Sequence, residues 1–414
     1  MNLTIAIFEG ADFDILSDFM QQGLLPNFKK LGNIFRATCS CIPYEAAGLM
    51  SAFSGIPENV HGISSYWKAQ NYSYIPELWR SEQVKDKMIW NQSCMDKYNK
   101  TIINLWGTHP VYPINGSIVS YSMEKSLRYT YPSDLSKNLV KKNINCVQDT
   151  CTLFNKGMSP NEFGDNVRRI DKMRHKAFVE LSDNSNLSII NYTSIDRVSH
   201  FFFDEFLSEG INSQIHLAYK QCDEILGQLL LIAEHNKSDL IVFSEIGFGK
   251  LKRFVNINDE LLKGGLLAYS NKTINWEKTV AFESVQGSHG ININKKNVFK
   301  NGIIDDRQYE KTLNETICFL KTLKNKDTGM PLFKRVVKNI EYYINYTNAP
   351  DIILEPFDQE YLPYGDPHWS DFLTRNSQTG WHRSNGIYSA YTKQNVPMRD
   401  IQVDEIYKIV KQHI

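Results

Sequence analysis

Three short apolar segments of the chain share one layout. Each has the length of a β-strand, is rich in Ile, Val or Phe, and leads into an acidic residue. The segments are LTIAIF, which leads to Glu9, LSIINYT, which leads to Asp196, and LIVFS, which leads to Glu245. Amphipathic helical patterns lie between them, at residues 13–22, 46–53 and 214–234. This alternation predicts an α/β fold in which helices sandwich a mostly parallel sheet.

The acidic residues after these strands are candidates for a functional site. In open parallel sheets, ligands bind beyond the carboxyl ends of the strands. Glu9, Asp196 and Glu245 are therefore expected to converge, although they lie far apart in the sequence. One acidic residue after a strand is more often a turn residue or a helix cap. The occurrence of three in the same position is what favours a site.

Residues 66–180 have a different character. They are rich in Tyr, Asn and Lys, show weak periodicity and contain loop-like pieces such as THPVYPINGS. With 414 residues, the chain exceeds the size at which one simple core stops growing, so it forms two domains or one large core with an insertion. We expect a single α/β domain over residues 1–414, with residues 66–180 inserted as a cap over the sheet.

Charge and composition narrow the range of partners. The chain has 46 basic and 46 acidic residues and no dense Lys/Arg run, so neither a nucleic-acid polymer nor a membrane is expected as a partner. A small phosphorylated or anionic substrate fits better. The start MNLTIAIFEG has no basic flank and is too short for a signal or membrane segment, which predicts a cytoplasmic protein. The seven scattered cysteines are expected to be reduced thiols.

The segment YTSIDRVSHFFF places Asp196 and His200 four residues apart. If a helix begins just after the strand, these side chains project from one face, close enough to bind one metal ion. A capping aspartate and a histidine packed in the core would explain the same pattern. The pair alone leaves both interpretations open.

Eight segments of the chain occur in an order that resembles a known family. They are IFEGADFDIL, LPNFKKL, GLMSAFSGIPENVHGI, PVYPINGSIVS, DRVSHFFF, VFSEIGFG, APDIIL and TGWHRSNGI. Together they resemble the type I phosphodiesterase/nucleotide pyrophosphatase family of the alkaline phosphatase superfamily. The resemblance implies an alkaline-phosphatase-like fold. It also implies two metal ions at the carboxyl edge of the sheet, with a Thr or Ser nucleophile between them.

The resemblance assigns metal-ligand roles to particular positions. Asp196, His200 and His382 match the family's ligands of the first ion. At the second ion, Glu9 and Glu245 stand where the family has aspartates. The first site is therefore expected to be intact and the second to be altered.

Two further departures affect the chemistry. The family's second-site histidine is Ile246 here, which cannot bind a metal, and His289 in VQGSHGININ is one possible replacement. A loop histidine beside glycines is more often a turn residue or a substrate contact, so that question stays open. Counting back from Gly55, the nucleophile position falls on Glu45. A carboxylate attacking phosphorus would form an acyl phosphate, and beside two further glutamates Glu45 is better suited to be a metal ligand.

The six ligand positions supply four carboxylates and two imidazoles. Such an oxygen-rich set suits Mg, Mn or Fe better than Zn, and it also matches the ligands of carboxylate-bridged di-iron centres. We therefore expect two divalent ions, either Mn, Fe, Zn or Mg.

The leading hypothesis for the function is a metal-dependent hydrolase of a phosphodiester, a nucleotide or a related phosphorylated metabolite. A metal-bound water would attack the phosphorus, and Glu45 would bridge the ions or accept the proton of that water. The first alternative is a di-iron or di-manganese redox enzyme, similar to an oxygenase, on the same fold. The second is a ligand-binding homologue without turnover. The number of ligands favours the two enzymes over the binding protein.

Overall fold

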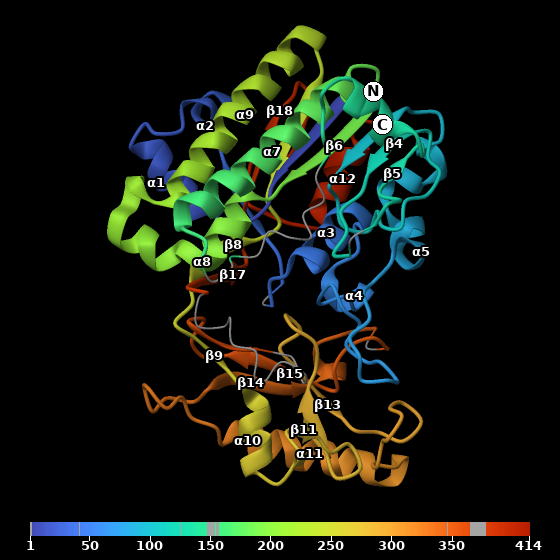
Figure 1. Ribbon diagram of the computed structural model, residues 1–414, viewed down its shortest axis with the longest axis vertical. Helices are drawn as coiled ribbons and strands as arrows, with labels where there is room; N and C mark the ends of the chain where they lie inside the picture. The colour runs from blue at the N-terminus through green and yellow to red at the C-terminus, as the bar shows by residue number, and fades with distance from the viewer. Residues whose placement is uncertain are drawn as a thin grey trace.

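A nine-stranded mixed sheet forms the centre of the protein (Figure 1). A computed structural model describes residues 2–40, 42–124, 126–146, 154, 157–345, 347–364 and 378–414. The strands, in their order across the sheet, are β19 (Ile401–Gln402), β2 (Phe35–Thr38), β18 (Asn385–Tyr391), β7 (Asp239–Phe243), β1 (Leu3–Phe8), β6 (Leu187–Tyr192), β3 (Lys100–Ile103), β4 (Gly116–Val119) and β5 (Thr130–Tyr131). Strands β7, β1, β6, β3 and β4 run parallel, whereas β18 and β5 are antiparallel to their neighbours. The predicted mostly parallel sheet is confirmed.

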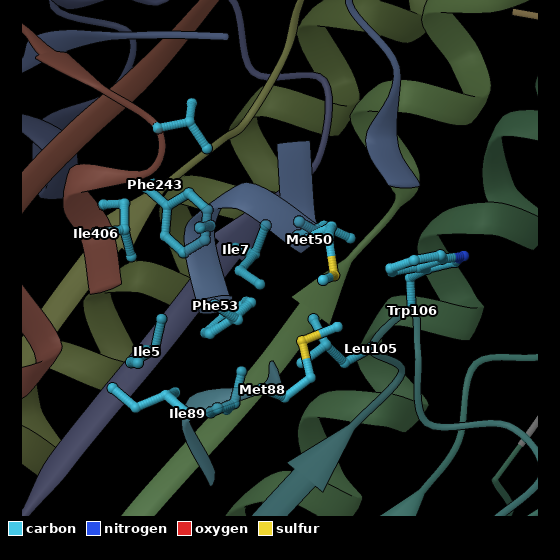
Figure 2. Packing of buried hydrophobic residues seen from close by; sticks show 14 of the residues in the cluster. Ile5, Ile7, Met50, Phe53, Met88, Ile89, Leu105, Trp106, Phe243 and Ile406 are labelled. Carbon is cyan, nitrogen blue, oxygen red and sulfur yellow. The ribbon is translucent and has the colours of Figure 1, made fainter. Parts of the chain in front are cut away.

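Helices cover both faces of this sheet because successive strand residues point to opposite sides. In β1, Ile5 and Ile7 belong to one apolar cluster, whereas Ala6 and Phe8 belong to the other. The first cluster includes side chains of α3 (Glu45–Ser54) and α12 (Glu405–Lys411). Figure 2 shows Ile5 and Ile7 among residues of this cluster. The helices of the second cluster are α1 (Phe13–Gln21), α2 (Pro26–Leu31), α6 (Leu135–Lys141), α7 (Pro160–Ser182), α8 (Ser194–Glu209) and α9 (Gln214–Asn236).

The predicted cap at residues 66–180 is wrong. This segment contributes β3, β4 and β5 to the main sheet, and most of it lies within the main lobe. Helix α7, which ends at residue 182, packs against β3 and β6. The strands were missed because β3 and β4 have only four residues each, which is too short for a clear periodic signal.

A second lobe lies at one end of the main sheet, at the bottom of Figure 1. Its elements are β9 (Arg253–Val255), α10 (Ile257–Lys263), β10 (Tyr269–Ser270), β11 (Thr273–Ile274), β12 (Ala281–Glu283), β13 (Gly290–Ile293), α11 (Asp306–Lys321), β14 (Phe333–Lys338), η5 (Asn339–Glu341), β15 (Ile352–Pro356) and β16 (Tyr361–Pro363). Strands β12, β13, β15 and β14 form an antiparallel sheet that buries its own apolar cluster with α10 and α11. The lobe outside the main sheet is therefore built from residues 253–363.

Residues 66–79 connect the two lobes through Tyr74. The ring of Tyr74 stacks on Trp276, with ring centroids 3.8 Å apart, and on Phe299, with ring centroids 5.2 Å apart. Its hydroxyl donates a hydrogen bond to Oδ1 of Asn294, at 2.8 Å. A side chain from the first fifth of the sequence is thus part of the core of the second lobe.

A buried carboxyl group links the lobes at a second point. Glu58, the first residue of α4 (Glu58–His61), accepts hydrogen bonds from the hydroxyls of Tyr343, at 2.8 Å, and Tyr342, at 3.3 Å. Burial raises the pKa of Glu58 to about 7, although hydrogen bonds from Ser40 and the two tyrosines lower it in part. Glu58 therefore binds a proton more tightly in the folded chain than in the unfolded chain.

We predict that this group makes stability depend on pH. Between pH 4.5 and about 7 the folded state holds a proton at Glu58 that the unfolded state has lost, so the free energy of unfolding falls as pH rises. Glu58→Gln should remove a contribution of up to about 3 kcal/mol over this range. Urea unfolding at several pH values measures the difference between wild type and variant. Parallel stability curves for the two proteins would contradict the assignment.

Candidate metal centre

Adjacent parallel strands bring the predicted acidic residues to one edge of the sheet. Glu9 follows β1, and Glu245 follows β7, the neighbour of β1 on one side. Asp196 lies in the first turn of α8, which follows β6 on the other side of β1. The backbone N–H of Asp196 donates to the carbonyl of Glu9, at 3.1 Å, and all three side chains are buried. The sheet topology thus brings residues more than 200 positions apart to one place.

Four buried side chains form a group with the dimensions of a metal site. They are Glu45 in the first turn of α3, Asp196 and His200 on α8, and His382 on β17 (Gly380–Arg383). One potential ligand atom from each residue lies within 4.8 Å of those from the other three. The Nε2 atom of His382 lies 3.3 Å from Oε1 of Glu45 and 3.4 Å from Oδ1 of Asp196. The structure therefore brings the predicted first-site residues together and adds Glu45 to them.

The histidines of this group respond differently to their surroundings. Burial lowers the pKa of His200 to about 4, although Asp196 acts in the opposite direction. Burial also disfavours the charged form of His382, but Glu45 and Asp196 outweigh it and raise the pKa to about 9. His200, Arg197 and His382 hold the pKa of Asp196 below its usual range despite burial. Asp196 and Glu45 therefore favour the positively charged form of His382.

Glu9 and Glu245 lie next to this group but outside it. Within the described part of the chain, no other residue donates a hydrogen bond to either carboxylate oxygen of Glu245. Burial, with Glu45 and Asp196 nearby, raises its pKa to about 8. Burial and the charges of Asp196 and Glu245 also raise the pKa of Glu9. Four carboxyl groups therefore share a buried region in which their negative charges repel one another.

Close backbone packing holds these carboxylates in place. Gly10 has a left-handed φ of 83°, and a Cβ there would lie 2.9 Å from Cα of Asp196. In α3, a Cβ on Gly48 would lie 2.7 Å from both Cβ and Cγ of Glu245. Both glycines are required because a larger residue would displace a carboxylate of the centre.

Comparison with known proteins identifies the family. The type I phosphodiesterase/nucleotide pyrophosphatase family matches residues 4–385. The chain belongs to this family. The predicted resemblance is therefore confirmed, and the family is one of hydrolases. A comparison with curated protein sequences gives no match.

Solved structures of low sequence identity share the fold. Murine ectonucleotide pyrophosphatase/phosphodiesterase 5, an inactive variant in complex with AMP, is 11% identical with a TM-score of 0.56, over 100% of this chain and 94% of that chain. Phosphonoacetate hydrolase from Sinorhizobium meliloti, in complex with phosphonoformate, is 12% identical with a TM-score of 0.62, over 100% and 95%. The alkaline phosphatase PafA is 11% identical with a TM-score of 0.65, over 99% and 95%. These similarities confirm the alkaline-phosphatase-like fold.

The structure also shows how the altered family positions are used. Ile246 is fully buried in the apolar cluster that contains Ala6 and Phe8, so it belongs to the core. His289 is buried in the second lobe, where burial and the charges of His382 and Arg383 lower its pKa to about 3. It lies outside the four-residue group. Among the described residues, no helix is both long and apolar enough to cross a membrane.

Sequence reasoning missed the polar residues around the carboxylates. Arg197 forms an ion pair with Asp196, lies 4.0 Å from Oε1 of Glu9 and donates to the hydroxyl of Tyr121, at 3.4 Å. Asn191 on β6 donates to Oε2 of Glu9. Arg197 could have been suspected from its place beside Asp196, whereas an asparagine inside an apolar strand gives no signal of its partner.

Two tyrosines next to Glu45 were also missed. The ring of Tyr44 contacts those of His382 and Tyr66, with centroids 5.5 and 5.3 Å apart. Burial, and next the charge of Glu45, raise the pKa of both tyrosine hydroxyls far above the usual value, so both stay protonated. They are therefore hydrogen-bond donors beside an acidic cluster.

We predict that Gly48→Ala destabilises the protein, although alanine is normally favoured inside a helix by about 1 kcal/mol. The added methyl group overlaps Cβ and Cγ of Glu245, which are close to the backbone and have little freedom to move. Overpacking of this kind costs about 1–3 kcal/mol. Urea unfolding of the metal-free protein measures the change. A variant as stable as wild type would show that Glu245 is not held against α3.

Proposed function

We propose that this protein is a metal-dependent hydrolase of a small phosphorylated metabolite, either a phosphodiester or a nucleotide. The observation that carries the proposal is the buried group of Glu45, Asp196, His200 and His382, whose ligand atoms lie within 4.8 Å of one another. Membership of a phosphodiesterase and pyrophosphatase family supports the reaction class.

The residues present fit divalent metal ions. Five buried oxygen atoms of the acidic residues accept no hydrogen bond from any residue that the structure describes: Oε1 of Glu9, Oε2 of Glu45, Oδ1 of Asp196 and both oxygens of Glu245. Leaving such atoms unpaired in the interior is costly unless a cation binds them. Burial and mutual repulsion raise the pKa of Glu9 and of Glu245, and a bound cation would favour the ionised form of both carboxyl groups. We propose two ions, one held by Asp196, His200 and His382 and the other by Glu9 and Glu245, with Glu45 between them.

The donor atoms favour particular metals. Four carboxylates and two imidazoles suit Mn, Fe or Mg better than Zn, which prefers nitrogen and sulfur. When bound, the ions would polarise the phosphoryl oxygens and supply the nucleophilic water.

The protein groups around the ions have separate roles in this proposal. Oε1 of Glu45 faces His382, while Oε2 is buried, has no hydrogen-bond partner among the described residues and is suited to accept the proton of the attacking water. Glu45 also lies in the first turn of α3, where the helix dipole favours a negative charge. The charge of Arg197 lowers the pKa of Asp196, and it offsets part of the rise in the pKa of Glu9 that burial and the neighbouring carboxyl groups cause. The hydroxyls of Tyr44 and Tyr66 stay protonated near Glu45, so they can act as hydrogen-bond donors there.

A small anionic substrate is supported by two of the solved neighbours. Their structures contain AMP and phosphonoformate, respectively. A cytoplasmic location belongs to the same proposal. It is supported by five free cysteines among the described residues, which suit a reducing compartment.

The same ligands favour one alternative, a carboxylate-bridged di-iron or di-manganese redox enzyme. Oxygen dependence separates the two reactions because hydrolysis requires no change of oxidation state.

We predict that metal-loaded protein cleaves an activated phosphodiester or a nucleotide without oxygen, and that Mn, Mg and Zn each support some rate. Anaerobic assays after removal and replacement of the metal measure this. Activity confined to iron-loaded protein in air would instead support the redox enzyme. Tight metal binding without turnover of any phosphorylated substrate would support a binding homologue.

We predict that Glu45→Thr weakens metal binding by at least about 10-fold and produces no gain of phosphodiesterase activity. The change restores a hydroxyl at the family's nucleophile position but removes a carboxylate from the centre. Metal content after dialysis, measured by elemental analysis, is the direct readout. Glu58→Gln is the control, because it alters a buried glutamate outside the centre and should leave metal content unchanged. Robust turnover by Glu45→Thr with unchanged metal content would show that Glu45 is not a ligand.

A further inference from the structure

Helix α8 carries two of the proposed ligands, and its N-terminus is buried. Asp196 and His200 both lie on this helix, and its N-cap residue, Thr193, makes no capping hydrogen bond with its own side chain. The first N–H groups of a helix have no partner within the helix, and leaving them unpaired in the interior costs about 1–3 kcal/mol each. Another part of the protein must therefore satisfy them.

Asp171 on α7 supplies that partner. Its Oδ2 atom accepts a hydrogen bond from the N–H of Ser194, at 2.7 Å, and from the N–H of Thr193, at 3.1 Å. Asp171 is fully buried. A carboxylate that accepts from backbone N–H groups at a helix start makes charge-assisted bonds and also interacts favourably with the helix dipole.

Arg174 fixes Asp171 in this position. One nitrogen of its guanidinium, Nη1, donates to Oδ1 of Asp171, at 3.0 Å, and to Oγ1 of Thr193, at 2.8 Å. Arg174 is buried as well, so α7 and the start of α8 are joined by a compact network of charged groups. Such a network resists displacement because breaking any one bond leaves a buried polar group unpaired.

The backbone N–H of Asp196, further along the first turn of α8, is bonded to the centre itself. The N–H of Asp196 donates to the carbonyl of Glu9, and the N–H of Arg197 makes a helical bond to the carbonyl of Thr193. The first turn of α8 is thus held by Asp171 on one side and by the backbone of Glu9 on the other. A shift of this turn would move Asp196 and His200 together, away from Glu45 and His382.

We infer that Asp171 is a positioning residue, which orients Asp196 and His200 for metal binding by capping α8 from a neighbouring helix. The inference rests on the proposed metal centre. Asp171 forms hydrogen bonds with Arg174 and with the backbone of Thr193 and Ser194, and its effect on the ligands passes through that backbone.

The chain contains a matched control. Asp223 on α9 caps α2 in the same way, by accepting from the N–H groups of Asn27, at 2.9 Å, and Phe28, at 2.8 Å. Helix α2 carries none of the proposed ligands. Asp223→Asn therefore makes the same change, loss of the negative charge and of one acceptor oxygen, at a comparable cap without touching the helix of the centre.

The experiment compares Asp171→Asn and Asp223→Asn with the wild-type chain of residues 1–414. Co²⁺ is the probe, and both its affinity and its visible absorption spectrum are measured. We expect Asp171→Asn to lower Co²⁺ affinity about 10–100-fold and to alter the spectrum, as loss of a group that orients a ligand does. Asp223→Asn should leave both unchanged. Hydrogen exchange at the N–H groups of Thr193 and Ser194 should become faster in Asp171→Asn alone.

Each other outcome has a definite meaning. Unchanged Co²⁺ affinity and spectrum in Asp171→Asn, or an equal loss in Asp223→Asn, would overturn the positioning role while leaving the proposed metal centre intact. Wild-type protein that binds no divalent ion would overturn the proposed function, and the positioning role with it. If Asp171→Asn does not fold, Arg174→Lys replaces it, since that change keeps the charge but weakens the hold on Asp171. Unchanged Co²⁺ affinity in that variant would then overturn the positioning role.

Discussion

Repulsion among four buried carboxyl groups is the constraint on which the rest of this structure depends. Glu9, Glu45, Asp196 and Glu245 are each almost fully inaccessible to solvent, and their charges raise one another's cost of ionisation. A core selected for stability alone would not gather them, because buried carboxylates without partners destabilise the folded state. Rigid surroundings are needed to keep them together. Parallel strands, a helix that starts at Glu45 and glycines at positions of close contact provide that rigidity.

The arrangement also explains why several polar groups outside the centre are buried. Arg197 and Asn191 contact carboxylates directly, and Asp171 with Arg174 secures the helix on which Asp196 lies. Burying any of these polar side chains without a partner would destabilise the fold, and each of them forms an ion pair or a hydrogen bond with another buried group. The centre is thus the inner part of a larger polar network that extends from the sheet edge to α7. Away from this network, both faces of the sheet are covered by apolar clusters.

How much of the fold could be predicted from the sequence depended on how long each apolar segment is. Strands β1, β6 and β7 are five or six residues long and strongly apolar. The acidic residues that follow them could therefore be placed at one edge of the sheet from the sequence. Strands β3 and β4, with four residues each, gave too little signal, and residues 66–180 were misassigned as a result. Glu45 was found only by counting from a family motif. The cap formed by Asp171 could not be predicted, because it depends on how α7 and α8 pack and leaves no trace in local spacing. The roles of the six residues as ligands remain predictions.

The insertion of Tyr74 into the second lobe limits how this protein can be rearranged. The chain enters that lobe after β8 (Gly247–Lys250) and leaves it after β16, which would normally mark a module that can be exchanged between relatives. Tyr74 comes from a separate segment and fills the space between Trp276 and Phe299. Exchange of residues 253–363 alone would therefore leave an aromatic side chain of the main lobe without its site. The packing of this one side chain therefore couples the second lobe to the rest of the chain.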